Sequence, residues 1–207
     1  MSQRKPVLGL CGGIGAGKSS VAKEFERLGC LVVDSDELNH QVLRRPEILR
    51  QLQEWWGSDV ALKSGEPNRT RIAERIFGDE SAKRRLEDLV YPLIAELREH
   101  MIRIGNQDSA VKVIILDSPL LFESNLDRLC DCVVFVDASE AVRLERLQRD
   151  RGWDRQQLRR RETWQLPPDD KRARSEFVIN NEDAPERLTP QVEAVLNNVI
   201  DRQSTRR

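Results

Sequence analysis

Short apolar runs alternate along this chain with longer stretches in which apolar residues recur at helical spacing. The runs are Val7–Cys11, Leu31–Val33, Val111–Asp117, Cys132–Asp137 and Phe177–Asn180. The third and fourth are near-continuous and rich in β-branched residues, which is typical of parallel strands buried on both faces. The pattern therefore predicts five strands of one parallel sheet.

Helical spacing fills the intervals between these runs. Helices are expected at Ser19–Leu28, Leu38–Leu43, Glu47–Trp56, about 69–105, Glu140–Arg149 and Pro185–Arg202, and Pro92 must start or kink a helix. No strand pattern interrupts the stretch from about Arg69 to Gly105. We therefore expect a single α/β domain over 1–207, a doubly wound parallel sheet with helices on both faces and a helical insertion at 58–106.

Residues 12–19 carry the most specific motif, Gly-Gly-Ile-Gly-Ala-Gly-Lys-Ser, which fits the phosphate-loop pattern G-x-x-x-x-G-K-[ST]. It follows a predicted strand and opens a predicted helix, the geometry in which backbone N–H groups bind a phosphate. Residues Gly13, Ile14, Gly15, Ala16, Gly17, Lys18, Ser19 and Ser20 are the candidate ATP-binding residues. Lys18 is expected on the β/γ-phosphates and Ser19 on Mg²⁺.

Acidic residues follow two other strands at the edge where the phosphate loop lies. Asp34 and Asp36 come after the second strand and Asp117 ends the third. Ligands bind outside the carboxyl ends of such strands. One of Asp34 and Asp36 is expected to face the γ-phosphate, to hold Mg²⁺ through water or to accept a proton; the other could cap a helix. Asp117 either holds Mg²⁺ through water or caps a turn.

Ten arginines lie between residues 140 and 174, among acidic residues typical of a solvated helix. A phosphoryl-transfer enzyme needs cations to close over the transferring phosphate. We interpret residues 149–174, bounded by Pro167-Pro168, as an arginine-bearing lid in which two or three arginines contact phosphate.

Composition narrows the function classes. The formal net charge is −1, with 33% charged and 39% hydrophobic residues, so no nucleic-acid partner is expected. No apolar run approaches the ~18 residues of a membrane span, so no membrane partner is expected either. The four cysteines lack the spacing of a zinc site and are expected to be reduced and mostly buried. These features favour a cytoplasmic protein, which we expect to be a monomer or a weak homo-oligomer.

A set of short motifs extends from Val7 to about Pro185. They are the loop continued as Ser20-Val21-Ala22, Leu28-Gly29, Val33-Asp34-Ser35-Asp36, Arg69, Ile76-Phe77, Pro119-Leu120-Leu121-Phe122-Glu123, Arg161 four residues before Gln165, and Val178-Ile179-Asn180-Asn181. In this combination the chain resembles the dephospho-coenzyme A kinases, a nucleoside-monophosphate-kinase-like branch of the phosphate-loop proteins.

The resemblance implies transfer of the ATP γ-phosphate, with Mg²⁺, to the 3′-hydroxyl of dephospho-coenzyme A. Asp36 matches the proposed base for that hydroxyl, and Lys18 and Arg149 complete the implied catalytic set. Arg69, Pro119, Leu120, Leu121, Phe122, Glu123 and Arg161 match acceptor-side positions, and Arg149 and Asn181 match ATP-side positions, with Asn181 near the adenine. The insertion matches an acceptor-binding helical domain.

The chain departs from the family pattern at several places. Tyr91 replaces the usual histidine before Pro92, Asn68 the usual aspartate before Arg69, and Asp183 a glycine near the adenine loop. Two other function classes stay open beside the kinase of dephospho-coenzyme A. One is another small-molecule or nucleoside-monophosphate kinase of the same branch, and the other is a nucleotide-binding module without catalysis.

Overall fold

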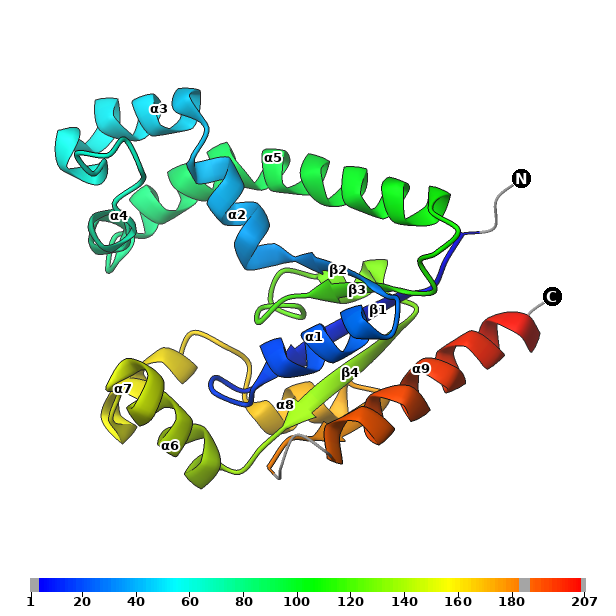
Figure 1. Cartoon of the computed structure of the whole chain (residues 1–207). Helices are drawn as coiled ribbons and strands as arrows, with labels where there is room; N and C mark the ends of the chain where they lie inside the picture. The colour runs from blue at the N-terminus through cyan, green and yellow to red at the C-terminus, as the bar shows by residue number, and fades with distance from the viewer. Residues whose placement is uncertain (1–3, 183–186, 206–207) are drawn as a thin grey trace. The chain divides into compact units, whose positions relative to one another are not determined.

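The computed structural model describes residues 4–182 and 187–205. Its centre is a sheet of five strands, β1 (Val7–Gly12), β2 (Leu31–Asp34), β3 (Ile114–Asp117), β4 (Cys132–Asp137) and β5 (Phe177–Asn180), shown in Figure 1. The strand order is β2-β3-β1-β4-β5, and every neighbouring pair is parallel. The predicted α/β class with a doubly wound parallel sheet is confirmed.

Most helices occupy the intervals in which helical spacing was found, whereas α7 (Arg155–Glu162) and α8 (Pro168–Ala173) lie in the arginine-rich stretch, for which no helix was predicted. The others are α1 (Lys18–Arg27), α2 (Ser35–Leu43), α3 (Pro46–Trp56), α4 (Arg69–Ile76), α5 (Glu80–Gln107), α6 (Glu140–Arg151) and α9 (Leu188–Thr205), with 3₁₀ turns η1 (Ser58–Val60) and η2 (Leu126–Leu129). Local chemistry sets their starts: Ser139 caps α6, and Asp154 and Gln157 form a capping box on α7.

The structure also differs from the predicted elements at some of their bounds. The predicted helix at 69–105 is divided into α4 and α5, and Pro92 lies inside α5 rather than at the start of a helix. A proline removes one backbone hydrogen bond, and buried Val90 and Ile94 on either side favour keeping the helix continuous. Strand β3 begins at Ile114, not Val111, and α9 begins at Leu188. The predicted helix start at Pro185 and the departure at Asp183 lie outside the described residues.

The main core lies between the sheet and helices α1 and α9. Leu8 and Leu10 of β1 point into it, and they meet Phe25 of α1 and Val192 of α9, all fully buried. These side chains recur every second residue in the strand and every third or fourth in the helices, so the sequence pattern accounts for this layer.

The other face of β1 is approached closely by the segment that follows β3. A Cβ at Gly9 would lie 2.7 Å from Leu121 Cδ2 and 2.9 Å from Cys130 Sγ. Glycine at this position therefore lets the buried Leu121 side chain lie directly on the strand. This contact holds the segment after β3 against the sheet.

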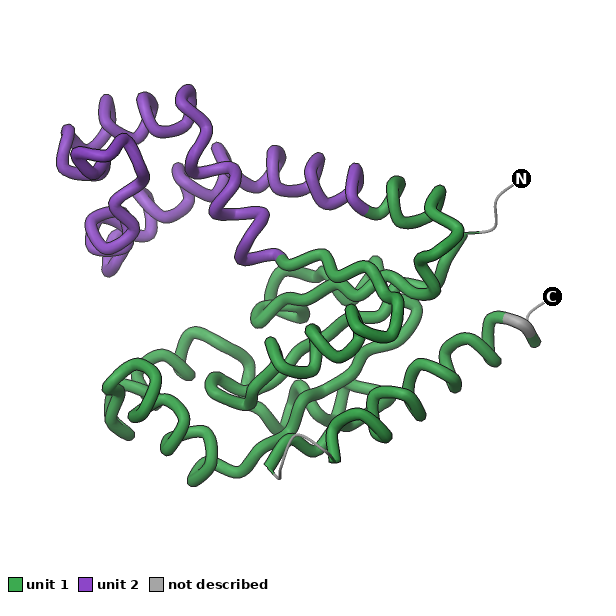
Figure 2. Tube along the Cα trace, in the orientation of Figure 1, with its two compact units in different colours: residues 1–34, 102–207 green, residues 35–101 purple. Residues whose placement is uncertain are grey.

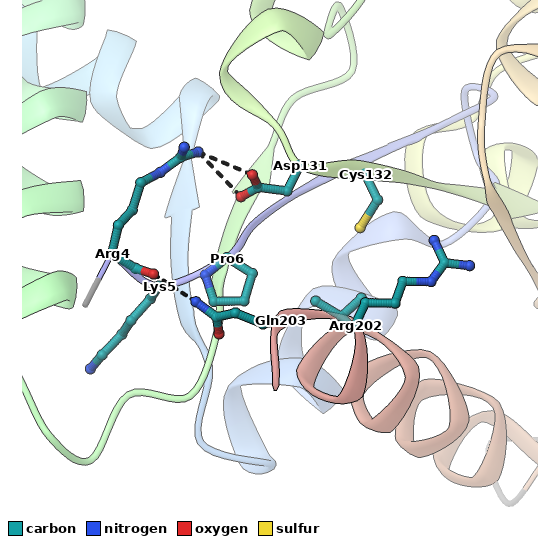
Figure 3. Close-up of a pocket in the computed structure, with 8 residues that line it drawn as sticks. Arg4, Lys5, Pro6, Asp131, Cys132, Arg202 and Gln203 are labelled. Atoms are coloured by element: carbon teal, nitrogen blue, oxygen red, sulfur yellow. Dashed lines mark hydrogen bonds and ion pairs between the residues drawn. The ribbon is translucent and has the colours of Figure 1, made fainter. Parts of the chain in front are cut away.

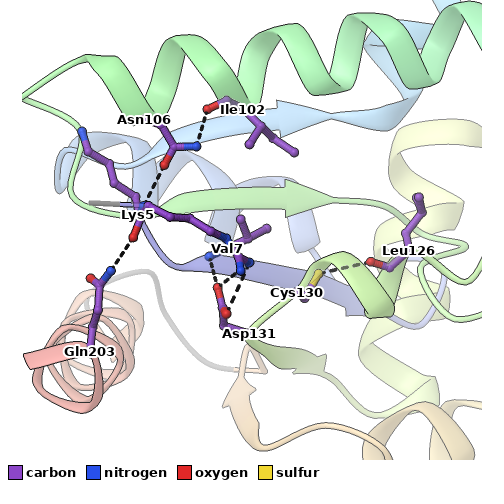
Figure 4. A network of polar contacts seen from close by, with 9 residues as sticks. Lys5, Val7, Ile102, Asn106, Leu126, Cys130, Asp131 and Gln203 are labelled. Atoms are coloured by element: carbon purple, nitrogen blue, oxygen red, sulfur yellow. Dashed lines mark hydrogen bonds and ion pairs between the residues drawn. The ribbon is translucent and has the colours of Figure 1, made fainter. Parts of the chain in front are cut away.

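A polar network ties the beginnings of the strands together, at the edge opposite the phosphate loop (Figure 4). Asp131 accepts hydrogen bonds from Val7 N at 2.8 Å and from the Arg4 guanidinium. Asn106 Oδ1 accepts from Lys5 N at 2.7 Å, and Gln203 donates to Arg4 O at 2.6 Å. The chain start is thus fastened to the ends of α5 and α9.

The chain divides into two compact units, residues 1–34 with 102–207 and residues 35–101, coloured in Figure 2. The first holds the whole sheet with α1 and α6–α9, and the second holds α2–α4 and most of α5. No helix within 4–182 and 187–205 is both long enough and apolar enough to cross a bilayer.

Candidate active site

The phosphate loop is the turn between β1 and α1. Strand β1 ends at Gly12, and α1 begins at Lys18. Gly15 and Gly17 both have φ of +81°, a left-handed conformation that glycine adopts without strain. Ala16 N donates to Gly13 O at 3.0 Å, which closes the turn. The first N–H groups of α1 therefore face the carboxyl edge of the sheet, where an anion can bind.

Three polar side chains from distant parts of the sequence hold the outside of this loop. Arg143 Nη1 donates to Ile14 O at 3.1 Å, and Arg146 Nη1 donates to Ala16 O at 3.2 Å. Asn181 Nδ2 donates to Ala16 O at 2.8 Å and to Gly17 O at 3.4 Å. The loop carbonyls are thereby satisfied on the protein side, which leaves the N–H groups for a ligand.

Helix α6 packs directly on the loop. A Cβ at Gly15 would lie 2.9 Å from both Arg143 O and Leu147 Cγ, so only glycine fits there. Arg143 is buried, and its Nη1 also pairs with Glu162 Oε1 of α7 at 2.6 Å. Sequence reasoning counted Arg143 and Arg146 only among the ten arginines. Their spacing of three on one helix places both on the face toward the loop, the one signal that could have identified them.

Lys18 and Asp117 form an ion pair at the carboxyl edge of the sheet. Asp117 is buried, and Asp34 is its register neighbour in β2. The predicted acidic strand ends therefore lie side by side next to the loop. Asp36 lies in the first turn of α2, in the second compact unit, and is exposed.

The oxygen donors near the loop fit a magnesium ion that is bound mainly by phosphate and water. Ser19 presents an exposed hydroxyl at the second position of α1, and Asp117 supplies a carboxylate oxygen nearby in the sheet edge. Within the described residues no group of three or more His, Cys, Asp or Glu side chains could hold a metal ion. Mg²⁺ typically takes only one or two protein ligands beside substrate phosphates, so these two side chains suffice.

The segment predicted to line the acceptor's path, Pro119 to Glu123, lies directly after β3. Leu121 and Phe122 are buried, whereas Leu120 is 37% exposed. Glu123 Oε1 pairs with Lys171 Nζ of α8 at 2.9 Å and accepts from Leu166 N at 2.8 Å. Glu123 is therefore engaged by the arginine segment, 149–174.

The two arginines predicted for phosphate contact lie on the surface. Arg149 Nε pairs with Asp150 Oδ1 at 2.8 Å, and its guanidinium lowers the pKa of the Asp150 carboxyl. The Arg161 guanidinium lies 3.8 Å from the centre of the Trp153 ring. Both side chains are exposed, and each has a partner within its own segment.

The remaining acceptor-side positions lie in the second compact unit. Arg69 is the exposed first residue of α4, and Asn68 caps that helix by accepting from Arg71 N at 3.3 Å. Tyr91 is half exposed and donates to Glu87 at 2.9 Å, and burial raises the pKa of its phenol to about 12. The departure at Asn68 thus serves local structure.

A separate pocket of about 120 Å³ lies at the opposite edge of the sheet (Figure 3). Its lining comes from the chain start, the start of β4 and the end of α9, and includes Arg4, Asp131 and Arg202. It is remote from the loop along every strand. The candidate active site is therefore placed at the carboxyl edge of the sheet, beside the phosphate loop, and not at this pocket.

The chain is similar to known proteins over most of its length. A family model described as dephospho-CoA kinase matches residues 6–186. The chain is 38% identical over 195 residues to a dephospho-CoA kinase of Syntrophotalea carbinolica, covering 94% of this chain and 92% of that protein. It is 35% identical over 188 residues to a dephospho-CoA kinase of Idiomarina loihiensis, covering 90% and 91%.

A solved structure extends the likeness to the fold. TT1252 of Thermus thermophilus aligns with a TM-score of 0.81 and 26% identity, over 95% of this chain and 98% of that one. The likeness therefore covers nearly the whole length of both chains, including the loop and the segments after β3 and β4.

Proposed function

The chain belongs to the dephospho-CoA kinase family, and we propose that it transfers the γ-phosphate of ATP to the 3′-hydroxyl of dephospho-CoA. The products are CoA and ADP, which makes this the last step of CoA synthesis. The observation that carries the proposal is the family match along 6–186, together with a phosphate loop whose carbonyls are already satisfied by the protein.

On the ATP side, residues 13–20 bind the triphosphate through backbone N–H groups and the start of α1. Lys18 neutralises charge that develops between the β- and γ-phosphates, and Asp117 holds its ammonium at the sheet edge. Ser19, and Asp117 through water, would hold Mg²⁺, which would add neutralising charge at the phosphate oxygens. Arg149 adds a cation, and Asn181 keeps the loop in shape.

On the acceptor side, Asp36 orients the 3′-hydroxyl and takes its proton late, because the transition state of phosphoryl transfer is loose. Asp34, two residues earlier and beside Asp117, is the competing carboxylate. Arg69, Arg161 and the segment 119–123 bind the acceptor. Residues 58–106 act as the acceptor-binding insertion and 149–174 as the lid.

We include a cytoplasmic location and a monomer or weak homo-oligomer in the proposal. The use of ATP as a substrate is consistent with such a location. All four cysteines are free thiols, which a reducing compartment favours.

An acceptor panel tests the function. The protein is incubated with Mg·ATP and, separately, dephospho-CoA, nucleoside monophosphates, gluconate and shikimate, and ADP is measured. ADP formation that depends on dephospho-CoA supports the proposal. Stimulation by another acceptor assigns the chain to a sister activity, and nucleotide binding without turnover identifies a binding module.

A further inference from the structure

Lys171 of α8 is a charged side chain held almost entirely away from water. The residue is 1% exposed and is among the largest fully buried side chains of the described chain. Burying an ammonium group is costly unless every proton finds an acceptor and an anion lies close. Its position therefore needs a specific set of partners.

Those partners come from two segments far apart in sequence. Lys171 Nζ donates to Pro119 O at 2.7 Å and pairs with Glu123 Oε1 at 2.9 Å. It also donates to Gln165 Oε1 at 3.1 Å. The three protons of one ammonium thus meet three oxygens, two at the ends of the segment 119–123 and one in the arginine segment.

The carboxylate of Glu123 tightens the same link. Its Oε1 accepts from Leu166 N at 2.8 Å as well as from Lys171, so the arginine segment holds it through both backbone and side chain. Its Oε2 is buried and makes no hydrogen bond among the described residues. Removing Lys171 would leave this carboxylate buried with one backbone donor, so the pair depends on both members.

We propose that Lys171 and Glu123 are positioning residues that lock the acceptor-side segment 119–123 to the arginine segment. Movement of the arginine segment over ATP then changes the shape of the acceptor's path, and acceptor binding favours the same movement. The inference rests on the proposed function, since it takes 119–123 as the acceptor side and 149–174 as the ATP-side lid.

The locked segments make ATP and acceptor binding interdependent. Two ligands that favour the same state of one element each raise the affinity of the other, by the same factor. Typical factors are about 5 to 150. A role in folding alone would lower the stability of the protein and leave this factor unchanged.

Calorimetric titration measures the factor. Dephospho-CoA is titrated into the full chain with and without a non-hydrolysable ATP analogue, and the ratio of the two Kd values is the coupling. In Lys171→Met the ratio should fall at least fivefold toward one. The Kd of the ATP analogue alone should stay within about twofold, because Lys171 contacts no residue of the phosphate loop in its three hydrogen bonds.

Two controls separate positioning from stability. Val192→Ala removes buried core volume beside α1 and should lower the melting temperature without changing the coupling. Lys112→Met removes an exposed lysine before β3 and should change neither. Gln165→Met removes one oxygen acceptor and keeps the ion pair, so it should lower the coupling less than Lys171→Met.

An unchanged coupling in folded Lys171→Met overturns the proposal. If that variant does not fold, unchanged coupling in Gln165→Met overturns it instead. A wild-type protein that neither binds dephospho-CoA nor makes ADP in its presence contradicts the proposed function itself, which is a separate outcome.

Discussion

The phosphate loop and the arginines expected to close over it are held in opposite ways. The loop is fixed from outside by the side chains of Arg143, Arg146 and Asn181, which satisfy its carbonyls. Arg149 has a side chain 68% exposed and pairs with its neighbour Asp150. Arg161 is exposed and lies on Trp153 in the same segment.

The difference assigns two separate tasks to the two regions. A loop already shaped for phosphate pays little ordering entropy when ATP binds, and its N–H dipoles are ready for charge that develops in the transition state. If Arg149 and Arg161 leave their surface partners only after ATP is bound, as the proposed lid requires, the way stays open for entry and product release. We therefore expect the loop to affect both ATP binding and phosphoryl transfer, and the arginines to act only when the segment 149–174 has closed over ATP.

The largest effect is expected at a carboxylate that belongs to neither region. Asp36→Asn should reduce kcat by ~10²–10⁴-fold, the usual cost of losing a general base. The KM for ATP should change little, because the base acts on the acceptor hydroxyl. Steady-state kinetics with both substrates varied measures this. A larger loss in Asp34→Asn than in Asp36→Asn would show that the base is Asp34.

In the phosphate loop, the largest effect is expected at Lys18. Lys18→Ala should lower kcat by ~10²–10³-fold, as for loss of one preorganised electrostatic group. Lys23→Ala, an exposed lysine of the same helix, is the matched control and should keep wild-type turnover. Near-normal kcat in folded Lys18→Ala would refute the role assigned to the loop lysine.

The next prediction concerns Arg149 and Arg161 of the arginine segment. Each charge-assisted hydrogen bond to phosphate is worth ~1.5–3 kcal/mol, so Arg149→Gln or Arg161→Gln should cost roughly 10- to 100-fold in kcat. Arg155→Gln, which removes an exposed arginine paired with Glu140, is the control. Kinetics at saturating ATP separates these effects from ATP binding.

Hydrogen exchange sharpens the same prediction. Residues 149–174 should gain most protection with a bisubstrate analogue, and residues 13–20 should already be protected by ATP alone. Equal exchange of 149–174 in all ligand states would contradict the lid and leave the arginines as a solvated surface.

The sequence predicted the phosphate loop better than the contacts of the arginine segment, for physical reasons. Gly15 and Gly17, followed by a lysine at the start of a helix, form a pattern that few structures other than a phosphate loop fit. Buried strands such as β4 can be recognised from their runs of β-branched residues. Contacts between residues far apart in the sequence give a much weaker sequence signal. Nothing in the order of residues says that Asn181 bonds Ala16 O, a contact that spans 165 positions.

Packing and burial explain the remaining differences between the predicted and the observed structure. Pro92 was expected to start or kink a helix, and it does not start one, because α5 continues through it and packing offsets the local penalty. The role of Lys171 was also missed. A lysine among arginines appears as surface charge until the fold buries it.

A smaller effect is expected at Asn181, which was predicted near the adenine. Because its amide bonds two loop carbonyls, Asn181→Leu should raise the KM values for ATP and GTP equally, by about 2- to 10-fold, the worth of one neutral hydrogen bond. A contact with adenine would instead change the ratio of the two KM values. Kinetics with both nucleotides decides between loop support and base recognition.

The smallest effect concerns the buried thiol directly before the loop. Burial raises the pKa of Cys11 to about 11 from 9.0, so near pH 8 its thiolate should be roughly a hundredfold scarcer than that of an exposed cysteine. Because the folded pKa is the higher one, the stabilising contribution is complete below pH 9. It is lost as the pH rises toward about 11, since the unfolded thiol ionises first. Alkylation with iodoacetamide, read by peptide mass spectrometry, should therefore be slow at pH 8 in the native protein and fast in urea. If native Cys11 reacts as fast as it does in urea, strand β1 opens readily next to the loop. The phosphate loop would then not be the fixed region that its contrast with the arginine segment requires.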